Sequence, residues 1–208
     1  MGGMMGPLLL PLLIMANLFG VGMIVPQAIR LHRTRVADGV SATWVGLSLA
    51  MNLWWLGYGL QGRLWGLVPV SIGALVVYGI VAIQVLSVIG PRARFPMVAG
   101  ALGPSLVLLA AYAMAGWSTV GLTLGLAYGL QFAPAAVSAT RAANTSGVSP
   151  TTWIMALTEA VIWVVYGLSV ADQALIIGGA GGSLVASVIV IRLAVCRAGR
   201  PVPTPLAT

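Results

Sequence analysis

The chain has 208 residues, of which 60% are hydrophobic and only 6% are charged, and its net charge is +7. Soluble domains carry about 25% charged residues, so this composition excludes a soluble globular protein, and most of the surface must face lipid. The apolar runs are continuous and do not alternate as the strands of a membrane barrel do. The sequence therefore predicts an all-α integral membrane protein.

Seven apolar runs are long enough, at roughly 20 residues, for a helix to cross a bilayer. In chain order they cover residues 7–29, 41–61, 65–90, 96–116, 118–140, 150–170 and 173–195. The segment before the first run has neither basic residues nor a small-residue cleavage site, so we interpret this run as a span and not as a signal peptide. We expect seven transmembrane helices.

Nearly all of the basic residues fall in loops on one side of the predicted membrane. Nine arginines follow the first, third, fifth and seventh runs, namely Arg30, Arg33, Arg35, Arg92, Arg94, Arg141, Arg192, Arg197 and Arg200. Because basic residues accumulate in cytoplasmic loops, we expect a multi-pass protein of the cell membrane with its N-terminus outside and its C-terminus in the cytoplasm. Topology explains the positive charge, and no nucleic-acid partner is expected.

One stretch of the sequence occurs twice. Residues 26–60 align without a gap to residues 134–168, an offset of 108 positions, and twelve of the 35 positions are identical. The identities include a proline, a tryptophan, a tyrosine and a Gly-Val-Ser triplet, which apolar composition alone does not explain. The pattern indicates duplication of a structural unit.

The repeat predicts the domain organisation. Each copy belongs to a group of three runs, and the unmatched fourth run between them makes both groups cross the membrane in the same direction, as parallel repeats. We expect a three-plus-one-plus-three arrangement. Its parts are a first three-helix repeat at 1–90, a linker helix at 91–117, a second repeat at 118–197 and a disordered cytoplasmic tail at 198–208.

Three prolines are candidate hinges. Pro26 and Pro134 occupy matching positions late in the first and fifth runs, and Pro150 begins the sixth run, where the first copy has Ala42. A proline lacks the backbone N–H and its ring clashes with the preceding turn, so it weakens a helix. We expect bends that let the cytoplasmic ends swing, although each proline could instead simply end its helix.

Two matched pairs of aromatic residues lie near the outer ends of the second and sixth runs. Trp55 and Tyr58 in the first copy match Trp163 and Tyr166 in the second, and each pair lies three residues apart on one helical face. They form either an interfacial aromatic belt or the outer end of a central passage. In the second interpretation the tyrosines are an extracellular gate, and the tryptophans offer flat faces to a ring-shaped solute.

Glu159 is the one carboxylic acid that we place within a span. An ionisable group at membrane depth is costly and marks a candidate functional site. Burial favours its protonated form, which could couple solute movement to a proton. The alternative is a protonated glutamate that bonds a neighbouring helix. Asn52 and Ser48, close to the matching position in the first copy, are further candidates for the same cavity.

The residue types that enzymes and metal sites require are missing from the sequence. There is one histidine, His32, in a basic loop, and one cysteine, Cys196, and neither belongs to a cluster of ligands or nucleophiles. Phosphate-binding loops and nucleophile motifs are absent as well. We expect no enzymatic activity, no metal and no cofactor.

Several of these residues together resemble the PQ-loop superfamily. They are Pro26-Gln27 near the end of the first run, the basic loop with Gly39-Val40-Ser41, a tryptophan-rich second run and Tyr58-Gly59. The three-plus-one-plus-three arrangement is similar to that of the SWEET sugar transporters in this superfamily. The resemblance covers roughly residues 7–195.

The resemblance implies a fold and a function. It implies two three-helix bundles that rock about prolines around a central path, with passive transport of mono- and disaccharides and no cofactor. The family's two sugar-contacting asparagines fall at Val70 and Gly178 here. Its prolines match Pro26, Pro134 and Pro150, and its fourth proline position is Ala42.

We therefore expect a facilitator of a small neutral solute, with a mono- or disaccharide first, that works by alternating access. Its substrate-binding candidates are Ser48, Asn52, Trp55, Val70, Glu159, Trp163 and Gly178. The alternative is a proton-coupled carrier of an amino acid or related metabolite that uses Glu159. A receptor or assembly factor is a third hypothesis. The expected partners are the solute and membrane lipid, and homo-oligomerisation stays open.

Overall fold

The computed structural model describes residues 6–37, 40–132, 136–137, 140 and 150–198, and these residues form helices and short connections without a β-strand. Within them, four stretches are long and apolar enough to cross a membrane: Leu8–Thr34, Val68–Ala115, Pro150–Val170 and Gln173–Cys196. The second of these contains two helices joined by a short turn. An all-helical fold with helices long and apolar enough to cross a membrane is thus confirmed for the described residues.

The helices lie mostly within the predicted runs, but four stretches of the described residues, and not the expected seven, are long and apolar enough to cross a membrane. In chain order they are α1 (Gly6–Gly22), α2 (Val25–Thr34), α3 (Ala42–Gln61), α4 (Val68–Ile89), the 3-10 helix η1 (Gly90–Ala93), α5 (Arg94–Ala115), α6 (Trp117–Leu130), α8 (Pro150–Val170) and α9 (Gln173–Ala198). α3 carries three tryptophans and Asn52. The predicted tail at 198–208 lies almost wholly outside the described residues.

A proline explains two departures from the predicted runs. The helix of the first run is broken, and the helix of the fifth run ends early. α1 ends at Gly22 and α6 ends at Leu130, each four residues before a proline of the repeat. A proline cannot donate to the carbonyl four residues earlier, and its ring clashes there. The expectation of one continuous helix over 118–140 was therefore wrong for the part that the structure describes.

The backbone bonds at these two breaks match one another. Met23 N donates to Phe19 O at 3.0 Å, and its repeat mate Gln131 donates to Ala127 O at 3.0 Å. Ile24 N donates to Val21 O at 3.1 Å, and the matching bond in the second copy is 3.3 Å long. The duplication is therefore visible in the backbone before the aligned stretch begins.

The turns after α3 and α8 also match. Leu64 N donates to Gly59 O at 2.8 Å, and Asp172 N, 108 positions later, donates to Gly167 O at 2.8 Å. The residues before these donors, Arg63 and Ala171, both have left-handed backbones with φ of 54° and 55°. This bond from the second residue beyond a helix back to its last turn is the Schellman cap.

The helices form two groups with corresponding contacts. α4 packs against α3 and against α1 and α2, and α9 packs in the same way against α8 and α6. We call α1–α4 the first half and α6, α8 and α9 the second half. Between the halves, α1 contacts α8 and α3 contacts α6, and these two contacts correspond under the repeat. α5 packs against α3 and α6.

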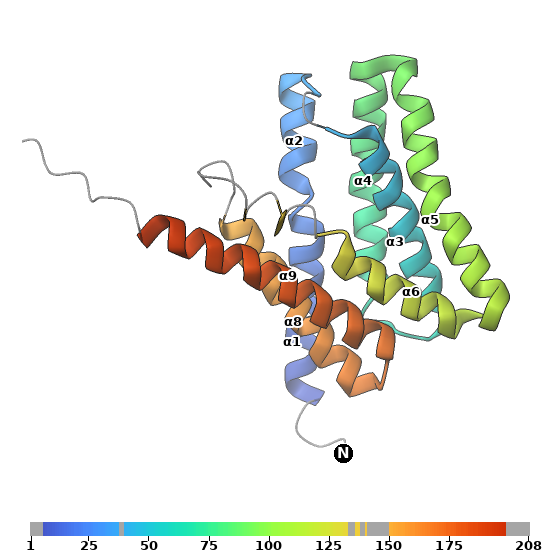
Figure 1. Cartoon of the computed structure of the whole chain (residues 1–208), viewed down its shortest axis with the longest axis vertical. Helices are drawn as coiled ribbons and strands as arrows, with labels where there is room; N and C mark the ends of the chain where they lie inside the picture. The colour runs from blue at the N-terminus through green and yellow to red at the C-terminus, as the bar shows by residue number, and fades with distance from the viewer. Residues whose placement is uncertain (1–5, 38–39, 133–135, 138–139, 141–149, 199–208) are drawn as a thin grey trace, which may run out of the picture.

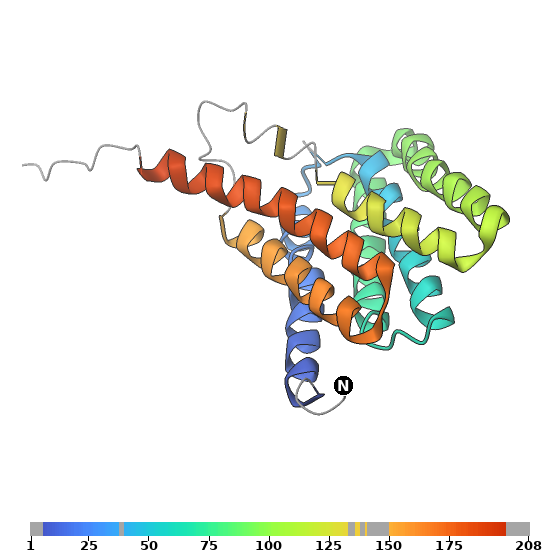
Figure 2. The ribbon, with the colours of Figure 1, turned by 60° about the horizontal axis from the view of Figure 1, so that its bottom comes forward.

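The two halves meet at one end and diverge toward the other. α1 to α5 run along the length of the molecule, whereas α8 and α9 slant away from them (Figure 1). The turned view shows the same separation (Figure 2). The end at which the halves meet contains the α3–α4 loop and the α8–α9 turn, and we call it the closed end.

Candidate functional site

A cavity of about 540 Å³ lies between the two halves, on the side where they diverge. It extends from Asn52 and Glu159, in the middle of α3 and α8, to the beginnings of these helices at Ser41 and Thr152. Val70, in the first turn of α4, lies at its inner end with Asn52 and Glu159. A smaller pocket of about 70 Å³ continues from the same three residues toward the closed end. Together they form one path that leads inward from the divergent side.

Several pairs of repeat mates line the same part of this path. The large cavity is lined by Gly20 with Tyr128, Met23 with Gln131, and Ile24 with Phe132. The smaller pocket is lined by Trp55 with Trp163, Leu67 with Leu175, Val70 with Gly178, and Ser71 with Gly179. All of these pairs are separated by 108 positions. Residues at matching positions of the aligned sequence therefore line the same parts of the path.

Glu159 lies where the two parts of the path join. The residue is 5% exposed, and Trp163 Nε1 donates to its carboxyl Oε1 at 3.0 Å. Across the path, Gly20 of α1 makes room for this carboxyl, because a Cβ at Gly20 would lie 2.6 Å from Glu159 Oε1 and 2.7 Å from Val70 Cγ2. The acid is thus held between α8 and α1 with its side chain in the path.

The other polar groups at this depth come mainly from α3. Asn52 lines both parts of the path, and its Nδ2 donates to Ser48 O at 2.9 Å. Ser48 is buried and lines the large cavity. The amide oxygen of Asn52 is left to accept from a solute, and the hydroxyl of Ser48 can donate or accept.

Aromatic rings cover much of the large cavity. On the first half, Trp44 and Tyr78 meet edge to face with ring centres 5.3 Å apart. On the second, Phe132 contacts Tyr128 at 5.3 Å and Trp153 at 6.0 Å, again edge to face. Rings in such contacts hold their orientation and present flat faces to a solute.

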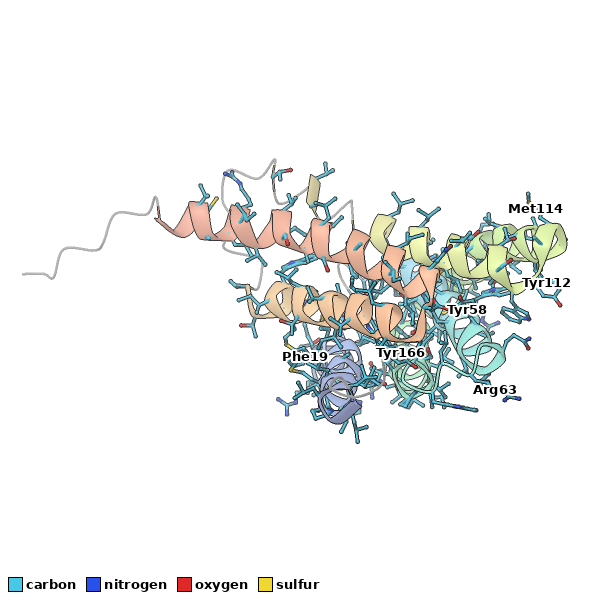
Figure 3. The ribbon with its side chains drawn as sticks, turned by 90° about the horizontal axis from the view of Figure 1, so that it is seen from below. Phe19, Tyr58, Arg63, Tyr112, Met114 and Tyr166 are labelled. Carbon is cyan, nitrogen blue, oxygen red and sulfur yellow. The ribbon has the colours of Figure 1, made fainter. Side chains whose placement is uncertain are left out.

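The two tyrosines of the repeat join the halves at the closed end. Tyr58 Oη donates to Asp172 Oδ2 at 2.6 Å, which connects α3 to the α8–α9 turn. In the opposite sense, Gly66 N in the α3–α4 loop donates to Tyr166 Oη of α8 at 3.2 Å. Seen from that end, both tyrosines lie near the middle, where helices of the two halves meet (Figure 3).

Asp172 and Asn17 strengthen this junction. Asp172 Oδ1 also accepts from Leu175 N at 2.9 Å and so caps the beginning of α9. Asn17 Nδ2 donates to Gly66 O at 3.0 Å, so both polar atoms of the Gly66 backbone are bonded to side chains of other helices. We call the Tyr58–Asp172 and Tyr166–Gly66 bonds the tyrosine bridges.

The structure brings the seven substrate-binding candidates together. Asn52, Val70 and Glu159 line both parts of the path, Ser48 lines the large cavity, and the smaller pocket contains Trp55, Trp163 and Gly178. Pro26 lies in the first turn of α2, directly after the helix break, and Pro150 begins α8. Pro134 lies outside the described residues.

Sequence reasoning missed several residues of the site. Gly20 and Tyr128 are repeat mates that lie before the aligned stretch, and extending the offset of 108 backwards would have paired them. Asp172 precedes a helix and could have been expected to cap it. Its bond to Tyr58, 114 positions away, has no signal in the sequence.

Comparison of the sequence with protein-family models gave no match, and comparison with curated proteins gave no significant match.

Proposed function

We propose that this protein is a membrane transporter that moves a small solute through the path between its two halves. The observation that carries the proposal is the arrangement of this path. It reaches the middle of the helices from one side, and the tyrosine bridges close it on the other. A transporter that works by alternating access holds its solute at such a midpoint, at the interface between repeats.

The architecture that we propose is three-plus-one-plus-three. The first half is one repeat, α6, α8 and α9 belong to the second, and α5 is the linker. The matched helix breaks, the matched turns and the reciprocal α1–α8 and α3–α6 contacts support two copies of one unit. We place the divergent side in the cytoplasm, because the arginine-rich loops lie there under the positive-inside rule, and the protein in the cell membrane.

Mono- and disaccharides are the first solutes to test, as the resemblance to SWEET transporters implies. Trp55 and Trp163 face the path as a matched pair, and Asn52 offers a carbonyl oxygen beside them. Flat apolar faces together with a few polar groups are typical of sites for small solutes. Facilitated movement of a neutral sugar down its gradient requires neither a cofactor nor a coupled ion.

Uptake into proteoliposomes tests the proposal. We expect the wild-type protein to equilibrate at least one labelled sugar of a panel, and Gly20→Val to reduce uptake at least about tenfold, because the added carbons overlap Glu159 and Val70 inside the path. Gly79→Val is the matched control, since a Cβ at Gly79 meets nothing within 4 Å.

Equal uptake by the wild type and the Gly20→Val variant would show that the solute does not pass through this cavity. Flat traces for every sugar would remove sugars from the proposal and leave the cavity to another solute.

The second candidate function is a proton-coupled carrier of an amino acid or related metabolite, and the position of Glu159 in the path favours it. Here we expect uptake to accelerate when the source side is acidified, and Glu159→Gln to abolish this acceleration. Glutamine keeps an oxygen for Trp163 but cannot release a proton. A Glu159→Gln variant with the pH dependence of the wild type would exclude this mechanism.

A further inference from the structure

Glu159 is the only charged residue among the described residues that line either part of the path. The chain contains no lysine, and neither an arginine nor the histidine belongs to that lining. A carboxylate in a buried site is costly unless a cation or several hydrogen bonds compensate it. The described residues supply one hydrogen bond, from Trp163.

Among the described residues that line the path, the neighbouring helices bring no counter-ion to Glu159. α1 faces it with Gly20, α4 lines the path with Val70 and Tyr78, and α6 lines it with Tyr128. α3 adds the neutral Ser48 and Asn52. The charge that would balance an ionised Glu159 is therefore missing from the described lining, and a bound solute can supply it.

The aromatic lining indicates what kind of cation fits. Ring faces attract ammonium groups, and the attraction strengthens when water is excluded. Rings of Trp44, Tyr78, Tyr128, Phe132 and Trp153 line the large cavity that contains Glu159. A metal ion would need several oxygen, nitrogen or sulfur ligands, and the described residues hold no group of three acidic, histidine or cysteine side chains.

We propose that the cavity binds a small organic cation, an amine or a quaternary ammonium compound, whose charged nitrogen lies beside the Glu159 carboxylate and whose carbon atoms contact the surrounding rings. An anionic solute is disfavoured because the described lining offers it no basic partner. This inference rests on the proposed role of the cavity as the solute site, and it favours a cationic solute over a sugar.

Calorimetric titration of the full-length protein in detergent micelles tests the inference with matched ligands. The cations are choline and benzylamine, and the neutral partners of similar shape are 3,3-dimethylbutan-1-ol and benzyl alcohol. We expect at least one cation to bind at least about tenfold more tightly than its neutral partner, because hydrogen bonds and contacts to a charged group are worth more than neutral ones.

The variant Glu159→Gln provides the second arm. It preserves the shape of the side chain and an oxygen for Trp163, and we expect it to weaken binding of the cation at least about tenfold, while binding of the neutral partner changes little. If this variant does not fold, the comparison of ligands on the wild-type protein decides alone.

Equal binding of each cation and its neutral partner, or unchanged cation binding by the variant, would overturn the inference. So would a panel in which neither cation binds. Uptake of a labelled sugar without cation binding would overturn the inference and leave the proposed transport function intact. Cation binding without uptake of any solute would support the inference and would contradict the proposed transport function.

Discussion

Removal of both tyrosine hydroxyls, in the variant Tyr58→Phe/Tyr166→Phe, is expected to open the closed end. The variant loses a hydrogen bond to the Asp172 carboxylate and one from the backbone of Gly66. A bond to a charged group contributes about 1.5–3 kcal/mol and a neutral one about 1 kcal/mol. Even a loss of about 2 kcal/mol shifts the equilibrium toward the open form roughly thirtyfold.

Distances between spin labels at the closed end would measure this shift. Labels at Gln61→Cys on α3 and Leu168→Cys on α8 lie on different halves and at exposed positions. The native Cys196 is first replaced by serine. We expect the double phenylalanine variant to add a population with a longer distance. An unchanged distance distribution would mean that the tyrosine bridges do not hold this end closed.

Tyr112→Phe is the matched control for loss of a tyrosine hydroxyl. Tyr112 lies on α5, is 47% exposed, and makes an edge-to-face contact with Trp117 that does not involve the hydroxyl. In Figure 3 it lies toward the edge of the molecule, beyond Tyr58. We expect its replacement to leave the label distances as they are in the wild type.

The second large effect is expected where α3 and α5 touch. A Cβ added at Gly46 would lie 2.8 Å from the carbonyl carbon of Met97, and one added at Gly100 would lie 2.8 Å from that of Thr43. Both overlaps are with backbone, which cannot rotate aside. We expect Gly46→Ala and Gly100→Ala each to lower the free energy of unfolding by about 2 kcal/mol, as overpacking does.

Gly103→Ala, on the same helix as Gly100, separates overlap from helix propensity. A Cβ at Gly103 meets nothing within 4 Å, and alanine favours a helix by about 1 kcal/mol relative to glycine. Thermal unfolding in detergent, followed by circular dichroism, should show a lower Tm for Gly46→Ala and Gly100→Ala and an equal or higher Tm for Gly103→Ala. Equal Tm values for all three variants would contradict the close packing of α3 on α5.

The linear pattern of the sequence was sufficient to predict an all-helical protein and to find the repeated stretch. Long apolar runs must form helices in lipid, because every backbone polar group needs a partner within its own segment. The offset of 108 positions indicated which residues play equivalent parts, and the structure places Trp55 with Trp163 and Val70 with Gly178 on one path. The breaks before Pro26 and Pro134 likewise follow from the chemistry of one residue type.

The differences between the copies were visible in the sequence, but their meaning was not. Glu159 stands where the first copy has Met51, and Met51 is buried in the apolar core and does not line either part of the path. Asp172 stands where the first copy has Leu64. Tyr58 therefore donates to a carboxylate in the second half, whereas Tyr166 accepts from a backbone amide in the first half. The two bridges are therefore unequal in strength.

By itself, then, the sequence predicted an all-helical protein with helices apolar enough for a membrane, a repeated stretch of 35 residues and one acid within an apolar run. These properties depend on composition and on local periodicity, which can be read directly from the sequence. Only the tertiary structure decided that Glu159 lies against Gly20 of α1 and that Tyr58 reaches Asp172. Both contacts join the two halves across more than 100 positions, and they exist because packing of the whole chain brings those helices together.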